Sequence, residues 1–426
     1  MKPKVQIKAY RNLSQIVTLI DAYQKDGRNL KADDLTILEN ASIVFDDEKI
    51  LWFGLERDFP DEYKTVEKTY FLEGKILTPE IVDSHTHIIF GGDRSFEYSM
   101  RLNGASYEQL AAAGGGIIHT VEATNKLSAA KLFELAKTRI ETIHSYGVGT
   151  IEIKSGYALT YEKELELSTI IHDLKLFFAP TVQIKNTFMA AHAVPPQFKD
   201  KSMNSGSSCS GGKINSNEYL KQVVIPLLEE LAKKKIIDVV DIFHEENYFS
   251  TEDVVLLFDK AKSLGIPTKI HADEFNNNGG AKLATEYASL SADHLLATDK
   301  DGIKALANSQ TVATLLPGTG LFLGKKSASA RDFLDAGVKV SIASDYNPGS
   351  CHCDNVILLA SIAAPLYKMN LAEVWAAITL NAAHALDLRN QGVIDKGFAS
   401  RFSLFNAKNI NYITYNWGKN FSFANL

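Results

Sequence analysis

The segment His85-Thr86-His87 has the residue types and spacing that a metal site needs. It follows the apolar residues Ile81 and Val82, which predict a buried strand. Side chains two positions apart on a strand point to the same face, so both imidazoles can approach one cation. A lone His-x-His pair is a weak signal, and its weight depends on further ligands.

Two further residues, much later in the chain, could complete a set of four metal ligands. His271 follows the apolar stretch GIPTKI, and Asp345 ends the stretch VKVSIAS. Each could instead cap an ordinary strand. Three neutral imidazoles and one carboxylate suit one divalent metal ion, Zn²⁺ or Fe²⁺, with a position left open for water. Such an ion lowers the pKa of its water toward ~7, which indicates hydrolytic chemistry.

Two further residues could move protons at this site. Glu274 lies three residues beyond His271, and His294 ends the stretch LSADH. We expect them to exchange protons with water or substrate. The alternatives are a solvated loop carboxylate for Glu274 and a hydrogen-bonded core histidine for His294.

Several other polar residues follow predicted strands and could clamp a carboxylate or a polar ring. Their types fit equally well with residues that shape loops. His244 could approach the metal, but four ligands are already available. The segment Cys351-His352-Cys353 is too cramped for one tetrahedral ion, so we interpret its cysteines as reduced thiols. The candidate substrate contacts are Arg94, Tyr107, Tyr157, His192 and Asn347.

The elements that position these residues alternate between apolar β-like runs and amphipathic helical stretches, which is typical of parallel βα units. Eight such units in succession predict an α/β fold, a (β/α)8 TIM barrel over residues 79–391. Candidate site residues follow several of the runs, at the carboxyl ends where barrel enzymes keep their active sites. The eight runs are IVDSH, GTIEIK, FFAPTVQIK, IIDVVDIF, IPTKIHA, LSADHL, TVATLLP and VKVSIAS.

Both ends of the chain contain short β-like runs without a helical period. Residues 1–78 and 392–426 are therefore expected to join into a small β-sandwich domain; the C-terminal runs are FASRFSLFNA and NYITYNW. A segment rich in Ser, Gly and Asn at 201–217 is interpreted as a surface loop.

Composition excludes several classes of partner. The chain has 45 basic and 51 acidic residues, a formal charge of -6, without long runs of one sign. This gives no support for nucleic-acid binding, and no stretch is apolar enough to span a membrane. With three cysteines and no apolar leader, a cytoplasmic location is expected. A small-molecule substrate is the remaining partner class.

The motifs VDSHTHIIFGGDR, EIKSGYAL, AAHAVP, KIHADEF, SADHL and SDYNPGS occur in the order seen in imidazolonepropionases, and the chain resembles that family over nearly its whole length. The resemblance implies hydrolysis of 4-imidazolone-5-propanoate, which carries a carboxylate, to N-formimidoyl-L-glutamate in histidine degradation. It also implies a homodimer. By motif, His85, His87, His271 and Asp345 would hold the metal and Glu274 and His294 would handle protons; the substrate contacts would be Arg94, Tyr157, His192, Glu274, Asn347, Gly349 and Ser350, with Tyr107 nearby.

The chain departs from the family pattern at the Ser/Gly-rich segment 201–217 and at Ala158, where glycine is expected. Two alternative functions stay open at this point. One is a related amidohydrolase that resembles a cytosine or guanine deaminase, and the other is a non-catalytic scaffold on a decayed barrel. Arg94 favours a carboxylate-bearing substrate over a nucleobase, and the full set of ligands disfavours the scaffold.

Overall fold

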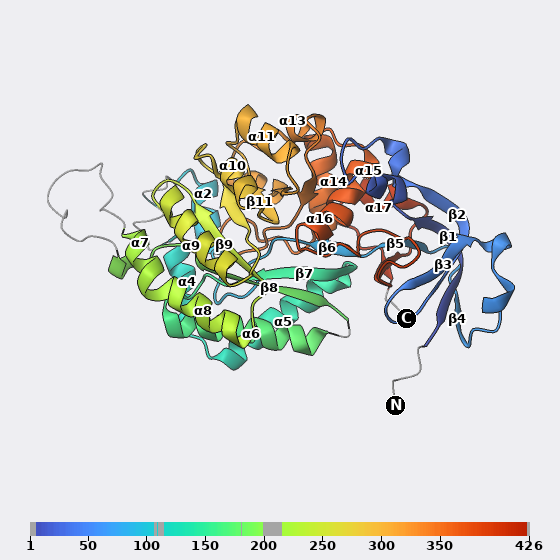
Figure 1. The fold of residues 1–426 in the computed structure, drawn as a ribbon, viewed down its shortest axis with the longest axis horizontal. Helices are drawn as coiled ribbons and strands as arrows, with labels where there is room; N and C mark the ends of the chain where they lie inside the picture. Colours follow the sequence, from blue (N-terminus) through green and yellow to red (C-terminus); the bar gives the residue numbers. More distant parts are fainter. Residues whose placement is uncertain (1–5, 106–108, 110–114, 180, 199–214, 424–426) are drawn as a thin grey trace.

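The computed structural model describes residues 6–105, 109, 115–179, 181–198 and 215–423. Within these ranges, no helix combines the length and apolar character that crossing a membrane requires. The chain forms two sheets, and Figure 1 shows the small one at one end of a larger assembly of strands and helices.

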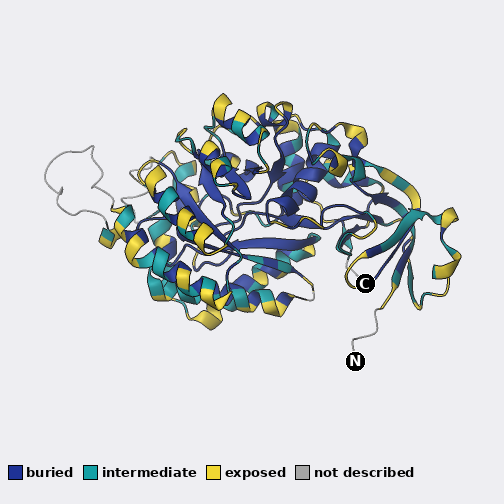
Figure 2. Cartoon of the chain, in the orientation of Figure 1, coloured by how far each residue is buried: buried dark blue, intermediate teal, exposed yellow. Residues whose placement is uncertain are grey.

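The larger sheet contains eight consecutive parallel strands in the order β13-β12-β11-β10-β9-β8-β7-β6. Its strands are buried along their whole length or nearly so, as Figure 2 shows, which is expected when helices cover the outer face. The strands are β6 (Ile81–Asp83), β7 (Val148–Lys154), β8 (Gln183–Ala191), β9 (Val239–His244), β10 (Ile270–Ala272), β11 (Ser291–His294), β12 (Val312–Leu315) and β13 (Val340–Ile342).

The first and last strands meet just beyond their carboxyl ends. The backbone N–H of Asp345 donates to the carbonyl of His85 at 3.0 Å, and that of His87 donates to the carbonyl of Tyr346, also at 3.0 Å. These bonds bring the end of β13 to the end of β6 and confirm the predicted barrel. They also place two proposed ligand segments side by side.

Helices follow the strands and pack around the barrel. Several start at capping residues; the hydroxyl of Ser250, for example, accepts from the N–H of Asp253 at 3.3 Å. The main ones are α2 (Ser95–Leu102), α4 (Ile117–Asn125), α5 (Ala129–Ser145), α6 (Tyr161–Phe178), α8 (Ile225–Lys234), α9 (Thr251–Ser263), α10 (Gly280–Glu286), α11 (Lys300–Ala307), α12 (Pro317–Leu323), α13 (Ala330–Asp335), α14 (Val356–Leu366), α15 (Leu371–Ala377) and α16 (Leu380–His384).

The small sheet draws strands from both chain ends, as predicted. The C-terminal strand β14 pairs antiparallel with β5, with Leu404 opposite Leu77, and both side chains are buried in its core. The sheet order is β15-β14-β5-β1-β2-β3, and β4 also pairs with β1. Its strands are β1 (Lys8–Val17), β2 (Ile37–Phe45), β3 (Ile50–Leu55), β4 (Lys68–Phe71), β5 (Ile76–Pro79), β14 (Phe402–Phe405) and β15 (Ser422–Phe423).

Two predicted strands differ from the observed elements. The run FFAPTVQIK begins too early, because Phe177 and Phe178 end α6 and the strand continues to Ala191. The run NYITYNW is not a strand, because its first five residues belong to the helix α17 (Ile410–Tyr415), which starts where the side chain of Asn409 accepts from the N–H of Tyr412. Aromatic and β-branched residues favour strands only weakly, and this cap with tertiary packing overrides them. Most of segment 201–217 lies outside the described residues.

Candidate metal and active site

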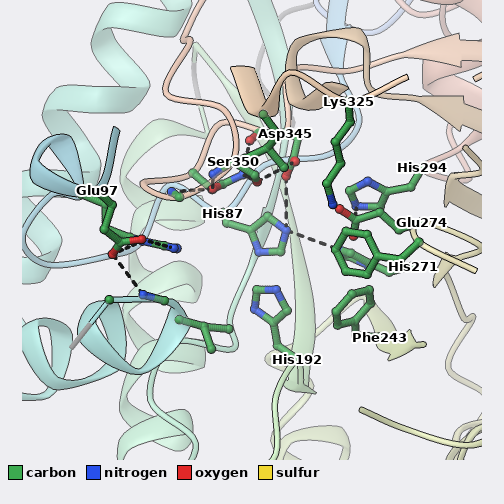
Figure 3. A pocket seen from close by; sticks show the side chains of 18 of the residues that line it. His87, Glu97, His192, Phe243, His271, Glu274, His294, Lys325, Asp345 and Ser350 are labelled. Atoms are coloured by element: carbon green, nitrogen blue, oxygen red, sulfur yellow. Dashed lines mark hydrogen bonds and ion pairs between the residues drawn. The ribbon is translucent and has the colours of Figure 1, made fainter. Parts of the chain in front are cut away.

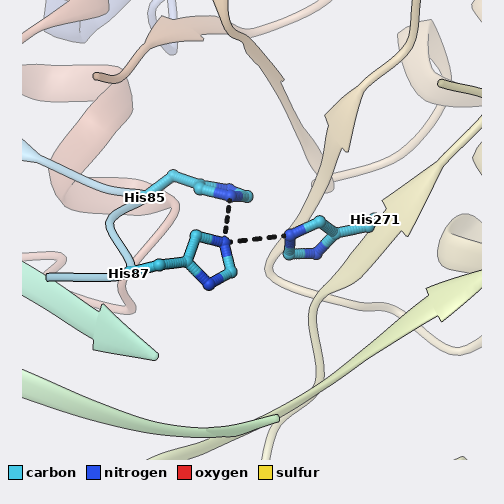
Figure 4. A group of neighbouring side chains, drawn as sticks. All are labelled: His85, His87 and His271. Carbon is cyan, nitrogen blue, oxygen red and sulfur yellow. Dashed lines mark hydrogen bonds between the residues drawn. The ribbon is translucent and has the colours of Figure 1, made fainter. Parts of the chain in front are cut away.

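Three histidine side chains meet inside the carboxyl end of the barrel (Figure 4). Nε2 of His87 lies 3.2 Å from Nε2 of His85 and 3.3 Å from Nε2 of His271. Oδ1 of Asp345 lies 3.5 Å from the His85 nitrogen and 3.7 Å from the His87 nitrogen. Ligands about 2.0–2.1 Å from a tetrahedral ion are about 3.3 Å apart, so these four residues fit one ion.

The protonation of the imidazoles also fits a cation. Burial lowers the pKa of His85 and His87 well below the ordinary value and lowers that of His271, so all three rings are neutral. A neutral ring carries one proton, and three Nε2 atoms that face one another cannot all be satisfied by hydrogen bonds among themselves. A shared metal ion satisfies all three lone pairs.

Two buried aspartates set the tautomers of His85 and His271. Oδ2 of Asp293 lies 2.6 Å from Nδ1 of His85, and Oδ2 of Asp241 lies 3.1 Å from Nδ1 of His271. Each carboxylate draws the ring proton to Nδ1 and leaves the Nε2 lone pair for the ion. Asp293 lies in the motif SADHL but was not marked as a site residue, and Asp241 lies in the predicted strand IIDVVDIF; a carboxylate inside an apolar strand is the signal that could have identified both.

The aspartates belong to a fully buried charge network below the metal site. Nζ of Lys154 lies 2.7 Å from Asp241 and 2.8 Å from Oε2 of Glu152, and Nζ of Lys269 lies 2.8 Å from the same Glu152 oxygen. Although burial lowers it, the pKa of Lys154 is raised by Asp241, Glu152 and Asp293. Lys154 therefore remains charged and compensates the buried carboxylates of Asp241 and Asp293.

Glu152, Asp293 and His85 lie close enough to share an ion of their own. The ammonium groups of Lys154 and Lys269 lie against this group, 3.7 and 3.5 Å from Oδ2 of Asp293. Two positive charges thus already neutralise these acids, which favours a single metal ion at the histidine group.

Asp345 is oriented by a residue that the sequence did not mark. The hydroxyl of Thr319, in α12, donates to Oδ2 of Asp345 at 2.6 Å. This bond occupies the oxygen remote from the histidines and leaves Oδ1 for the ion. Burial raises the pKa of Asp345 to about 7. A bound cation stabilises the charged carboxylate against that burial.

Glu274 and His294 lie together beside the ligands, as predicted. Oε2 of Glu274 is 3.8 Å from Nε2 of His294. Burial raises the pKa of Glu274 to about 8 and lowers that of His294 well below the ordinary value. The pair therefore holds a protonated acid next to a neutral base, an arrangement that can both give and take a proton near neutral pH.

A cavity of about 500 Å³ opens over the metal ligands (Figure 3). The wall of the cavity near His87 is aromatic. The ring of His192 stacks on the ring of His87 with the centroids 4.8 Å apart, and the centroid of the Tyr157 ring lies 5.3 Å from that of His192. Burial lowers the pKa of His192 to about 3, so this ring is neutral too. Both side chains line the cavity beside the candidate ligand His87.

The loop that follows Asp345 forms another wall of the cavity. Oδ1 of Asn347 accepts from the N–H groups of Gly349 and Ser350, both at 2.8 Å, so the Asn347 amide shapes this loop. A Cβ on Gly349 would lie 1.9 Å from Nη1 of Arg94, which explains the glycine. All three loop residues line the cavity, whereas Tyr107 lies outside the described residues.

His244 and the cysteine segment take no part in this site. Nε2 of His244 lies 3.1 Å from the hydroxyl of Thr251, and its ring is absent from the histidine group. Cys351 is a buried free thiol and Cys353 is partly buried.

Comparisons with known proteins identify the family of this chain. The model of the amidohydrolase family matches residues 76–425. The chain is 37% identical over 383 residues to the imidazolonepropionase of Bdellovibrio bacteriovorus, covering 89% of this chain and 86% of that protein. It is 35% identical over 414 residues to the imidazolonepropionase of Alkaliphilus oremlandii, covering 96% and 94%.

Among solved structures, the atrazine chlorohydrolase of Arthrobacter aurescens TC1 complexed with zinc superposes with a TM-score of 0.64 at 15% identity. The match covers 94% of this chain and 88% of that one. At this identity, the likeness confirms the fold.

Proposed function

This chain belongs to the imidazolonepropionase family of the amidohydrolases, and we propose how its residues carry out that family's reaction, the hydrolysis of 4-imidazolone-5-propanoate to N-formimidoyl-L-glutamate in histidine degradation. The observation that carries the proposal is one cavity with a group of metal ligands at its base and arginines at its side. A deaminase acting on an uncharged nucleobase would have no use for those arginines.

His85, His87, His271 and Asp345 hold one divalent ion, Zn²⁺ or Fe²⁺. When bound, such an ion supplies a Lewis acid and lowers the pKa of water toward neutrality. The chlorohydrolase with the same fold was solved with zinc, which supports zinc here. The neutral imidazoles and the carboxylate are a donor set that both metals accept.

The protein residues orient the ring and move the protons. Tyr157 and His192 hold the flat heterocycle over the ligands, so that its carbonyl carbon faces the attacking water. His294, the neutral base, accepts the proton that the water loses, and the protonated Glu274 delivers its proton to the departing ring nitrogen as the carbon–nitrogen bond breaks. Arg94, Asn347, Gly349 and Ser350 form the end of the cavity that receives the propionate.

The test is to purify the protein, measure its metal content and follow the loss of imidazolone propionate by ultraviolet absorbance. We expect His271→Ala to lose metal and turnover together. Glu274→Gln should keep its metal while kcat falls about 10²- to 10⁴-fold, the usual contribution of one acid or base. A metal-loaded wild-type protein that leaves this substrate intact would contradict the proposal.

We further propose a cytoplasmic homodimer, supported by the family resemblance and by the small number of cysteines. Light scattering at micromolar protein concentration measures the oligomeric state directly, and a monomer would contradict this part of the proposal.

A further inference from the structure

The helix α2 carries two arginines and one glutamate toward the cavity. Arg94 precedes the helix and Arg101 lies seven residues later, about two helical turns away and thus on the same side. Arg94, Glu97 and Arg101 all line the cavity, and Figure 3 shows Glu97 at its edge with its bonding partners. Two positive charges therefore face one negative charge at this end.

Both carboxylate oxygens of Glu97 accept hydrogen bonds from within the protein. Nε and Nη2 of Arg94 donate to its two oxygens at 2.8 and 2.7 Å, and the N–H of Gly116 donates to Oε1 at 3.0 Å. Burial opposes ionisation here, but Arg94 still holds the pKa of Glu97 below its ordinary value. The charge of Arg94 is thus compensated within the protein, and its Nε/Nη2 edge is already occupied.

Among the described residues, Arg101 has no carboxylate as a hydrogen-bond partner. Its Nη2 donates to the carbonyl of Gly349 at 3.2 Å, and its buried Nε has no hydrogen-bond acceptor among the described residues. Burial, and then the charge of Arg94, lower the pKa of Arg101. The guanidinium also lies 5.4 Å from the centroid of the Phe322 ring, but within the described part of the chain no carboxylate hydrogen-bonds to it. A half-buried cation beside another cation gains free energy from an added anion.

Both arginines lie beside the loop that follows Asp345. Gly349 contacts both of them and lies four residues after the metal ligand Asp345. Lys325 and Glu274 lie together at another part of the cavity wall, so the excess positive charge is confined to the α2 end. A ring held over the ligands can therefore extend its carboxylate arm toward Arg101.

We propose that Arg101 is a specificity-determining residue that binds the substrate carboxylate, while Arg94, paired with Glu97, orients that end of the cavity. The inference rests on the proposed function, because it takes the cavity as the substrate site. Under this proposal, Arg101, rather than Arg94 alone, makes the site prefer ligands with a carboxylate substituent over ligands with a neutral one.

The experiment compares two probes on the metal-loaded enzyme by calorimetry: 3-(imidazol-4-yl)propionate and 4-propylimidazole, which lacks the carboxylate. Arg101→Met keeps an unbranched apolar side chain up to the position of Nε and removes the charged guanidinium. We expect this variant to bind the propionate probe about 10- to 100-fold more weakly, which is the effect of losing a charged hydrogen bond. Its affinity for propylimidazole should stay within about twofold of the wild-type value. Arg101→Lys should restore part of the preference, and KM for substrate should rise more than kcat falls.

Lys325→Met is the matched control, since it removes the same charge from the same cavity away from α2. It should reduce the preference for propionate much less than Arg101→Met does. Equal weakening of both probes by Arg101→Met, or an unchanged preference, overturns the assignment of Arg101 alone. A wild-type protein that binds both probes equally overturns the proposed function and the inference together.

Discussion

Oδ2 of Asp293 lies 2.6 Å from Nδ1 of His85, while Nε2 of the same ring faces His87. The histidine thus connects a buried carboxylate to the proposed ion. Lys154 and Lys269 lie 3.7 and 3.5 Å from that carboxylate, so the orientation of a metal ligand depends on charges deep in the barrel. Such partners tune ligand basicity and metal affinity.

Replacing Asp293 by Asn tests this connection. The amide keeps the shape but removes the negative charge that favours a proton on Nδ1 of His85. We expect metal affinity to fall about 10- to 100-fold, measured by competition with a chelator of known affinity. Asp301→Asn, an exposed carboxylate in the first turn of α11, is the control. Equal affinities in both variants would show that the carboxylate does not tune His85.

Thr319→Val removes the hydroxyl that donates to Oδ2 of Asp345 at 2.6 Å. The released carboxylate can rotate, so Oδ1 is no longer fixed toward the histidines. We predict metal affinity about 10-fold lower than wild type, and near-normal affinity for Thr319→Ser, which retains the hydroxyl. Titration with a metal buffer distinguishes them. If valine and serine behave alike, the bond does not position the ligand.

Gly349→Ala places a methyl group where Nη1 of Arg94 now lies, at 1.9 Å. Arg94 must then move and weaken its bonds to Glu97, so we expect kcat/KM to fall about 10-fold or more through KM. Gly320→Ala in α12 is the control, because the nearest atom to its Cβ would be 3.7 Å away. Steady-state kinetics on both variants check the prediction, and an unaffected Gly349→Ala enzyme contradicts it.

His384 predicts a pH dependence of stability remote from the site. Burial lowers its pKa to about 4, against 6.5 for an ordinary histidine. Between these values the unfolded chain binds a proton that the folded chain does not. The free energy of unfolding therefore falls by up to about 3 kcal/mol as pH drops from 6.5 toward 4. Above pH 6.5 His384 causes no such loss of stability, because the ring is neutral in both states.

His384→Gln removes this titration. Urea unfolding of metal-free protein at pH 7.5 and 4.5 should show a smaller loss of stability for the variant than for wild type. An equal loss in the two proteins would mean that His384 is not the group responsible.

The barrel, the four candidate ligands and the pair of Glu274 and His294 could all be predicted from the amino-acid sequence. These follow from local patterns: apolar runs that alternate with helices, and polar side chains directly after them. Since carboxyl ends of parallel strands meet at one end of a barrel, such residues must gather whatever the details of packing.

The tertiary structure alone decided which groups touch. That Asp293 serves His85, that Thr319 holds Asp345 and that Glu97 neutralises Arg94 while Arg101 stays uncompensated depend on strand register, helix orientation and loop paths. Local periodicity does not encode these, because each contact joins a residue to whichever neighbour the packed fold brings within a few ångströms. For the same reason, residues 410–415 form a helix despite their β-like composition.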